Sequence, residues 1–154
     1  MAHARQVFDQ IPDPNIAPWN AMFKGYIGNK MYVDALILFA HMMNINVKPD
    51  YFIIPMVLKS CVKLLALRDG ERVHCFVVKV GFKSNPFVGT TLIDMYCSGG
   101  MVGYAYKVFS EIGSRNVVTW TSMIRGYISC GDIAMDVVSK ATKGDFRHVE
   151  KQRS

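Results

Sequence analysis

Apolar residues recur along this chain with the spacing of helices rather than the alternation of strands. In the first segment, the spacing i, i+1, i+4, i+5 is that of Met22, Phe23, Tyr26 and Ile27. In the second, the spacing i, i+3, i+4, i+7 is that of Ala35, Leu38, Phe39 and Met42. Both spacings place the apolar side chains on one face of a helix with a 3.6-residue period. Gly28 and Asn29 form a turn signal between the two segments, and 46–50, which contains Pro49, forms another after them. The pattern therefore predicts a helical hairpin of about 35 residues.

The hairpin is repeated along the chain. When residues 4–27 are aligned with 105–128, ten of the 24 positions are identical. The 101-residue offset divides into steps of 35, 35 and 31 residues, and further columns then appear. The small residues Ala35, Gly70 and Ala105 share one position, where we expect helices to approach closely. A fixed period of this kind is typical of repeat architectures.

These steps divide the chain into units and predict its fold class. One hairpin cannot bury both of its apolar faces, but stacked hairpins can, so the sequence predicts an all-α fold, an α-solenoid of stacked helix-turn-helix repeats. The predicted organisation is the tail of a truncated repeat at 1–15, repeats at 16–50, 51–85 and 86–116, a partial repeat at 117–132, and a divergent polar tail at 133–154.

Composition narrows the class of protein. With 51% apolar and 19% charged residues among 154, the chain is not intrinsically disordered. No apolar stretch has the length of a membrane span, and 1–20 lacks the apolar region of a secretory signal. The cysteines, at 61, 75, 97 and 130, have neither C-x-x-C nor zinc-ligand spacing, so we predict reduced thiols and no metal site. The net charge of +6 is compatible with a polyanionic partner.

Several motifs resemble one repeat family. Five segments resemble the pentatricopeptide repeat consensus: WNAMFKGY at 19–26, DALILFAHM at 34–42, VKPD at 47–50, LIDMY at 92–96 and VTWTSMIRGY at 118–127. No unit has the first-helix pattern of tetratricopeptide repeats. The unit at 51–85 resembles the long variant and that at 86–116 the short one. The order of lengths resembles the PLS class of plant organelles.

The resemblance implies sequence-specific binding of single-stranded RNA, read about one base per repeat. In the family, one residue of the first helix and the last residue of the repeat read the base. The implied base-reading positions are Asn20 with Asp50, Pro55 with Asn85, Thr90 with Asn116, and Thr121 in the partial repeat. The implied base-packing positions are Ala17, Phe52, Phe87 and Val118. The family's preferences imply uridine at the first unit, poor selection at the Pro55 unit, and adenosine at the third.

The residues themselves leave a structural alternative open. Asn15, Asp50, Asn85 and Asn116 all stand just before a predicted helix, where Asn and Asp are favoured as N-caps. We expect them to serve both as caps and as base readers. The unit at 51–85 has the highest net charge, +4, and includes Lys59 and Lys63, so phosphates should be attracted there unless these cations form only a solvated face.

No catalytic chemistry is predicted. RNA-editing members of the family carry a deaminase domain with H-x-E and P-C-x-x-C zinc motifs. His148 and Glu150 match H-x-E, but only four residues follow and no C-x-x-C exists, so the match is interpreted as chance. We expect no enzyme activity, no cofactor, no metal, no small-molecule substrate and no membrane association.

The resemblance implies a role and a place in the cell. It predicts a recognition module for organellar RNA modification (C-to-U editing) or processing in a mitochondrion or chloroplast, with editing-factor proteins supplying deaminase activity. Asp136 and Lys140 replace the small and aromatic residues that a complete unit would carry, which predicts a truncated member of a longer repeat protein. The alternatives are a helical scaffold for protein–protein interaction and a non-functional fragment.

Overall fold

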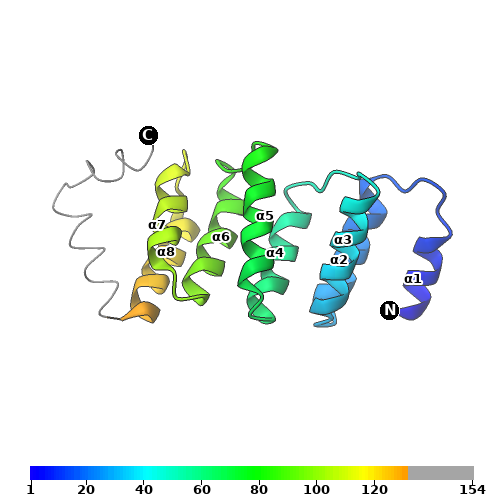
Figure 1. Cartoon of the computed structure of the whole chain (residues 1–154), viewed down its shortest axis with the longest axis horizontal. Coiled ribbons are helices and arrows are strands. Elements are labelled where there is room, and N and C mark those ends of the chain that lie inside the picture. The colour runs from blue at the N-terminus through cyan, green and yellow to red at the C-terminus, as the bar shows by residue number, and fades with distance from the viewer. Residues whose placement is uncertain (132–154) are drawn as a thin grey trace.

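The computed structural model describes residues 1–131, which form eight α-helices and no strand, as the periodicity predicted (Figure 1). The predicted tail at 133–154, with His148 and Glu150, lies outside the described residues. The helices are α1 (Ala2–Asp9), α2 (Ile16–Gly28), α3 (Tyr32–Asn44), α4 (Ile53–Lys63), α5 (Leu67–Lys79), α6 (Pro86–Ser98), α7 (Val102–Glu111) and α8 (Val117–Cys130).

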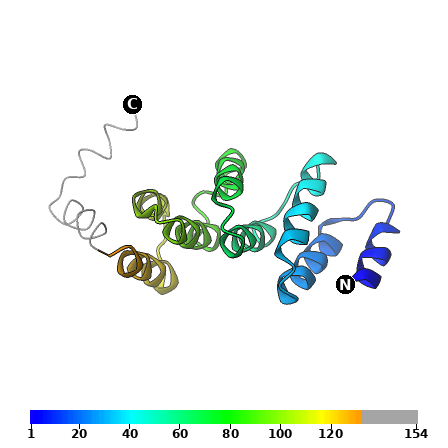
Figure 2. The same ribbon diagram turned by 60° about the horizontal axis from the view of Figure 1, so that its bottom comes forward.

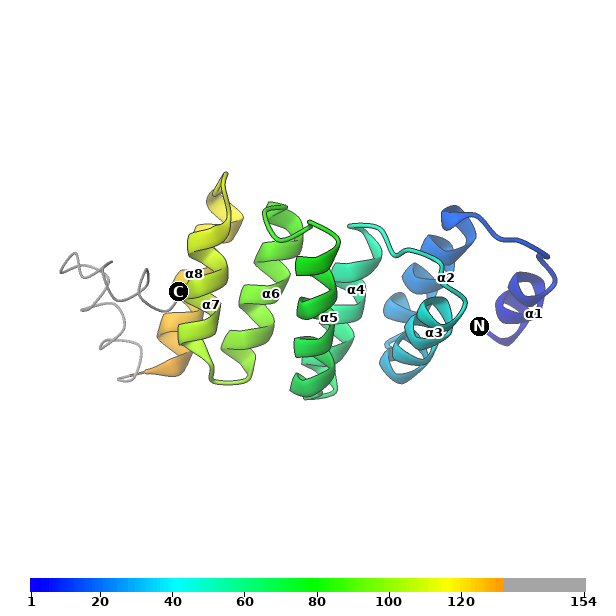
Figure 3. The same cartoon turned by 45° about the horizontal axis from the view of Figure 1, so that its top comes forward.

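The helices are arranged as a row of hairpins in two layers (Figure 2). The first helices of the hairpins pack on one another in the order α2, α4, α6, α8, and the second helices α3, α5 and α7 attach to them. In Figure 3 the row runs from the blue N-terminal helix to the orange α8. Each hairpin thus buries its apolar faces against its neighbours, and the fold is the predicted α-solenoid.

The 101-residue repeat seen in the sequence is reproduced in the aromatic contacts between hairpins. The ring of Phe8 meets that of Trp19 edge-on at 4.8 Å between centroids, and Phe109 meets Trp120 edge-on at the same distance. Edge-to-face contacts of this kind are favoured because the ring's positive edge meets the other ring's negative face. The second helix of one hairpin is therefore joined to the first helix of the next by the same aromatic pair at both ends of the array.

The small-residue column lies where helices approach closely. Ala35, Gly70 and Ala105 are all buried. A side chain built at Gly70 would overlap the sulfur of Met95 in α6. Glycine at this position therefore permits α5 to pack against α6, as the column predicted.

Candidate functional site

Side chains at the predicted unit boundaries cap the first helices of the hairpins. Asn15 Oδ1 accepts the backbone N–H of Ala17 at 3.0 Å. Asn85 Oδ1 accepts two backbone N–H groups at the start of α6, at 2.9 and 3.2 Å, and Asn116 Oδ1 accepts one at the start of α8 at 2.9 Å. The N-cap role predicted from the sequence is confirmed at these positions.

Asp50 combines a cap with a contact to the first predicted base reader. Its Oδ1 accepts the backbone N–H groups of Phe52 and Ile53 at 3.0 and 2.9 Å. Its Oδ2 accepts a hydrogen bond from Nδ2 of Asn20 at 2.9 Å. That Nδ2 also donates to the carbonyl of Ile16 at 3.3 Å, whereas Oδ1 of Asn20 is buried and has no hydrogen-bond partner among the described residues. The pair thus fixes the amide with its nitrogen toward Asp50 and its oxygen as a buried acceptor without a partner.

In the third unit the corresponding pair is joined through another residue. Thr90 Oγ1 lies 2.7 Å from the carbonyl oxygen of Pro86 and 3.1 Å from Oγ1 of Thr119, and its one proton can go to either acceptor. The Thr119 hydroxyl in turn donates to Oδ1 of Asn116 at 3.1 Å. Thr119 is fully buried and belongs to α8. Thr119 is not among the base-reading positions predicted from the sequence.

The two remaining predicted base-reading positions differ from these pairs. Pro55 is buried in α4, and its ring has neither donor nor acceptor, so Asn85 has no side-chain partner to hold there. Thr121 is exposed, and its hydroxyl donates to the carbonyl of Val117 at 2.7 Å.

The predicted base-packing residues are exposed at the starts of the first helices. Phe52 is 50% exposed, Phe87 55% and Val118 60%, and Ala17 is exposed as well. Burial of such large apolar side chains would be favourable, so their exposure leaves apolar surface available to a ligand.

A groove of about 690 Å³ brings two of these residues together with basic side chains. It is lined by Phe52, Pro55 and Phe87 and by Lys24, Lys59, Lys63, Asp94 and Arg125, with Ile27, Met56, Val62 and Thr91. Lys24, Lys59, Asp94 and Arg125 each stand four residues after a predicted base reader, one helical turn along. The sequence-based predictions do not include this column of charged residues, although its members are separated by the same 35, 35 and 31 residues as the predicted base readers.

The charges of the groove are uneven along its length. Arg125 and Asp94 form an ion pair at 3.7 Å between their side chains, and Arg125 also donates to Ser122. Burial raises the pKa of Asp94, while the hydrogen bond from Ser122 and the charge of Arg125 partly offset that rise. The α2 and α4 part of the groove carries lysines, whereas the α6 and α8 part carries a paired acid and base.

Only some of the basic residues of 51–85 line the groove. Lys59 and Lys63 do, whereas Arg72 lies 3.6 Å from Asp69 in an exposed pair elsewhere. The predicted attraction of phosphates to this unit therefore depends on two of its six basic residues.

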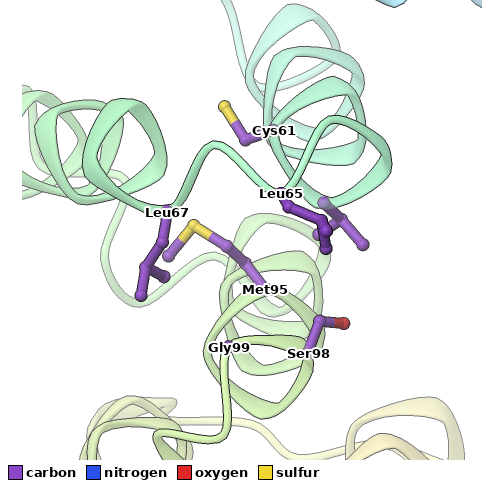
Figure 4. A pocket seen from close by; sticks show the side chains of 7 residues that line it. Cys61, Leu65, Leu67, Met95, Ser98 and Gly99 are labelled. Atoms are coloured by element: carbon purple, nitrogen blue, oxygen red, sulfur yellow. The ribbon is translucent and has the colours of Figure 1, made fainter.

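Two other cavities are lined mainly by apolar side chains. An apolar groove of about 480 Å³ opens between α3 and α5, lined by Ile37, Phe39 and Phe76 among others. A gap of about 60 Å³ lies where Leu67 and Met95 meet below Cys61 (Figure 4). Burial raises the pKa of the Cys61 thiol to about 11, so it stays protonated and is a poor nucleophile.

Residues 1–131 contain neither a cluster of metal ligands nor a helix that could span a membrane. No group of three or more His, Cys, Asp or Glu side chains there is arranged to hold a metal ion. No helix in that range is long and apolar enough to cross a bilayer.

The sequence is similar to a large set of plant proteins. The family model described as PPR repeat matches residues 17–47, 90–117 and 118–135, half of the chain. A putative pentatricopeptide repeat-containing protein of Arabidopsis thaliana is 41% identical over 129 residues, 84% of this chain and 23% of its own length. A second from the same plant is 37% identical over 148 residues, 94% of this chain and 21% of its own.

A third relative from Arabidopsis thaliana, whose name marks it as mitochondrial, is 42% identical over 125 residues, 81% of this chain and 18% of its own length. The chain thus spans about a fifth of the length of these curated relatives. With the helical hairpins, the repeated aromatic pair and the family match in agreement, the chain belongs to the pentatricopeptide repeat family.

Proposed function

We propose that this chain binds single-stranded RNA along the groove formed by α2, α4, α6 and α8. The observation that carries the proposal is the lining of that groove, where exposed Phe52 and Phe87 lie among Lys24, Lys59 and Lys63. Aromatic faces stack on unpaired bases and lysines attract the phosphates between them. A duplex would hide the base faces, so the arrangement suits a single strand.

The hydrogen-bonding groups support base reading by the paired positions. Asn20 Oδ1 is a buried acceptor without a partner, and the N3–H of uracil would satisfy it once a base displaces the side chains that cover it, while Asp50 keeps the Asn20 amide from turning. Thr90 with Asn116 is assigned adenine, and Pro55 with Asn85 selects poorly because proline offers no polar group. With the strand running 5′ to 3′ along the N-to-C direction, the preferred core is U-N-A.

The proposal extends to the organisation and cellular role. The repeat units are 16–50, 51–85, 86–116 and a partial unit from 117, in the long and short pattern of the PLS class. The module recognises an organellar transcript for modification or processing without catalysing a reaction, and other proteins supply the chemistry. The mitochondrial name of one relative and the family's plant members support this setting.

Binding assays with aromatic variants test the proposal. Phe52→Ala and Phe87→Ala should each weaken binding of a U-N-A single strand by about 1–3 kcal/mol, because each removes a stacking surface. The matched control is Tyr104→Ala, which removes an equally exposed aromatic of the second-helix layer. Fluorescence anisotropy at low salt gives the dissociation constants. Equal affinities for the wild type and both phenylalanine variants would contradict the proposal.

A second candidate function is a scaffold for another protein, and the apolar groove between α3 and α5 favours it. Val33 and Ile37 at this groove are 55% and 60% exposed, and an amphipathic helix would bury them. Ile37→Lys should abolish such an interaction and leave RNA binding unchanged. If Ile37→Lys instead weakened RNA binding as much as Phe52→Ala, the two surfaces would not be separate.

A further inference from the structure

The third unit holds its two base-reading side chains in a way that the first does not. In the first unit Asn20 reaches Asp50 directly, at 2.9 Å. In the third, the side chain of Thr90 is one bond shorter than an asparagine, and no direct hydrogen bond to Asn116 forms. The gap is bridged by the hydroxyl of Thr119, which lies 3.1 Å from Thr90 Oγ1 and 3.1 Å from Asn116 Oδ1. We propose that Thr119, a residue of the following repeat, is the positioning residue that sets the base preference of the Thr90–Asn116 pair.

The equivalent positions in the other units carry no hydroxyl. Thr119 is the third residue of its unit, and the third residues of the preceding units are Pro18, Ile53 and Val88. Ile53 and Val88 are fully buried apolar side chains, as the packing of the first-helix layer requires. A buried polar group at such a site needs partners, and among residues 1–131 the Thr119 hydroxyl finds them in Thr90 and Asn116. Thr119 is thus the one hydroxyl-bearing residue of this column, and it follows the unit whose base reader, Thr90, is too short to reach its partner, Asn116.

The bridge fixes which groups the pair presents to a base. Asn116 Oδ1 accepts both the backbone N–H and the hydroxyl of Thr119, so the amide oxygen is held inward and Nδ2 is left as a donor. Because the Thr119 hydroxyl donates its proton to Asn116, the link between the two threonines uses the Thr90 proton, which points at Thr119 Oγ1 in place of the Pro86 carbonyl, and the lone pairs of Thr90 Oγ1 remain as acceptors. A donor beside an acceptor complements N1 and the N6 amine of adenine. Guanine presents the reverse order, with N1–H and O6.

This inference rests on the proposed function, and the variants Thr119→Val and Thr119→Ser test it. Valine keeps the shape but removes the hydroxyl, and the backbone N–H that Asn116 caps remains. Binding is measured to short single strands that differ only in A or G opposite the third unit. Thr119→Val should reduce the preference for A over G at least about fivefold, because Thr90 and Asn116 lose the hydroxyl that links them while the cap from Asn116 to the backbone is kept. Thr119→Ser should keep the preference within about twofold, and Ile53→Val is the packing control with no expected change.

The outcomes separate the inference from the proposed function. If the wild type binds and prefers A while Thr119→Val retains that preference, the positioning role is overturned and RNA binding stands. The same holds if the wild type binds without distinguishing A from G. A measurement without RNA tests the bridge even if the wild type does not bind RNA. The side-chain amide resonances of Asn116 in a ¹⁵N-edited NMR spectrum should shift in Thr119→Val and stay in place in Thr119→Ser. Unchanged resonances in Thr119→Val would overturn the bridge even if no RNA bound.

Discussion

Replacing Asp50 by asparagine should change the base preferred by the first unit while leaving the fold intact. The Oδ1 position must remain an acceptor, because the backbone N–H groups of Phe52 and Ile53 point at it. The atom that faces Asn20 therefore becomes an amide nitrogen. Two donors would then face each other, so the Asn20 amide turns and its nitrogen takes the place of the buried, unpaired oxygen. The group left to pair with a base changes from an acceptor, which suits N3–H of uracil, to a donor, which suits N3 of cytosine.

The contacts set the size of the effect. An unmatched group at a desolvated contact costs about 1–3 kcal/mol, so the wild type should favour U over C by about 5-fold to 150-fold, and Asp50→Asn should reverse the order. Stability should change little, because both cap bonds survive. Asp50→Ala loses both of them and should lower the free energy of unfolding by about 1–2 kcal/mol.

Anisotropy titrations with two RNAs that differ only in U or C at the first position measure the preference. The ratio of the two affinities is insensitive to the charge that the substitution removes. Asn85→Asp is the matched control, because Asn85 caps α6 as Asp50 caps α4, but its partner position holds Pro55. A U-to-C ratio that stays constant in Asp50→Asn would show that Asp50 is a cap and does not orient the base reader.

Three further expectations follow from the same structure. The double substitution Asn20→Thr with Asp50→Asn reproduces the third unit's pair and should move the first-position preference from U towards A; a position-specific RNA pool would reveal an unchanged U. Asp94→Asn should strengthen RNA binding and steepen its salt dependence by about 0.7 in log–log slope, because Arg125 is released to a phosphate; salt titration against wild type checks this. Burial lowers the pKa of His74 below 6.5, so the folded state binds fewer protons than the unfolded state. Stability should fall as pH drops below 6.5, and His74→Phe should remove that part of the decrease in urea unfolding; parallel pH curves for both proteins would refute it.

Much of the fold could be predicted from the sequence. Helical periodicity is visible within one short segment, and the 101-residue offset gains support from each further position that matches. Trp19 and Trp120 occupy equivalent places, and their phenylalanine partners do as well. The caps were also predictable, since Asn and Asp before an apolar helical segment have one favoured use.

The remainder of the candidate site depends on distances between units that the sequence does not state. Whether Asn20 reaches Asp50, and which amide atom stays unpaired, follow from how α2 and α4 are spaced. Thr119 could not be assigned because its hydroxyl acts on residues of the preceding unit. The groove's charge column shares the repeat spacing, but only the structure shows that Asp94 and Arg125 pair.

In the proposed function, the lysines and exposed aromatics of one groove hold a single strand of RNA. Its most direct test is a salt titration of binding to a U-N-A single strand and to the same sequence as a duplex. With Lys24, Lys59 and Lys63 on the phosphates, the affinity for the single strand should fall with a log–log slope of about −2. The duplex should bind more weakly at every salt concentration. Equal binding of both forms, or no binding of the single strand at low salt, would contradict the account.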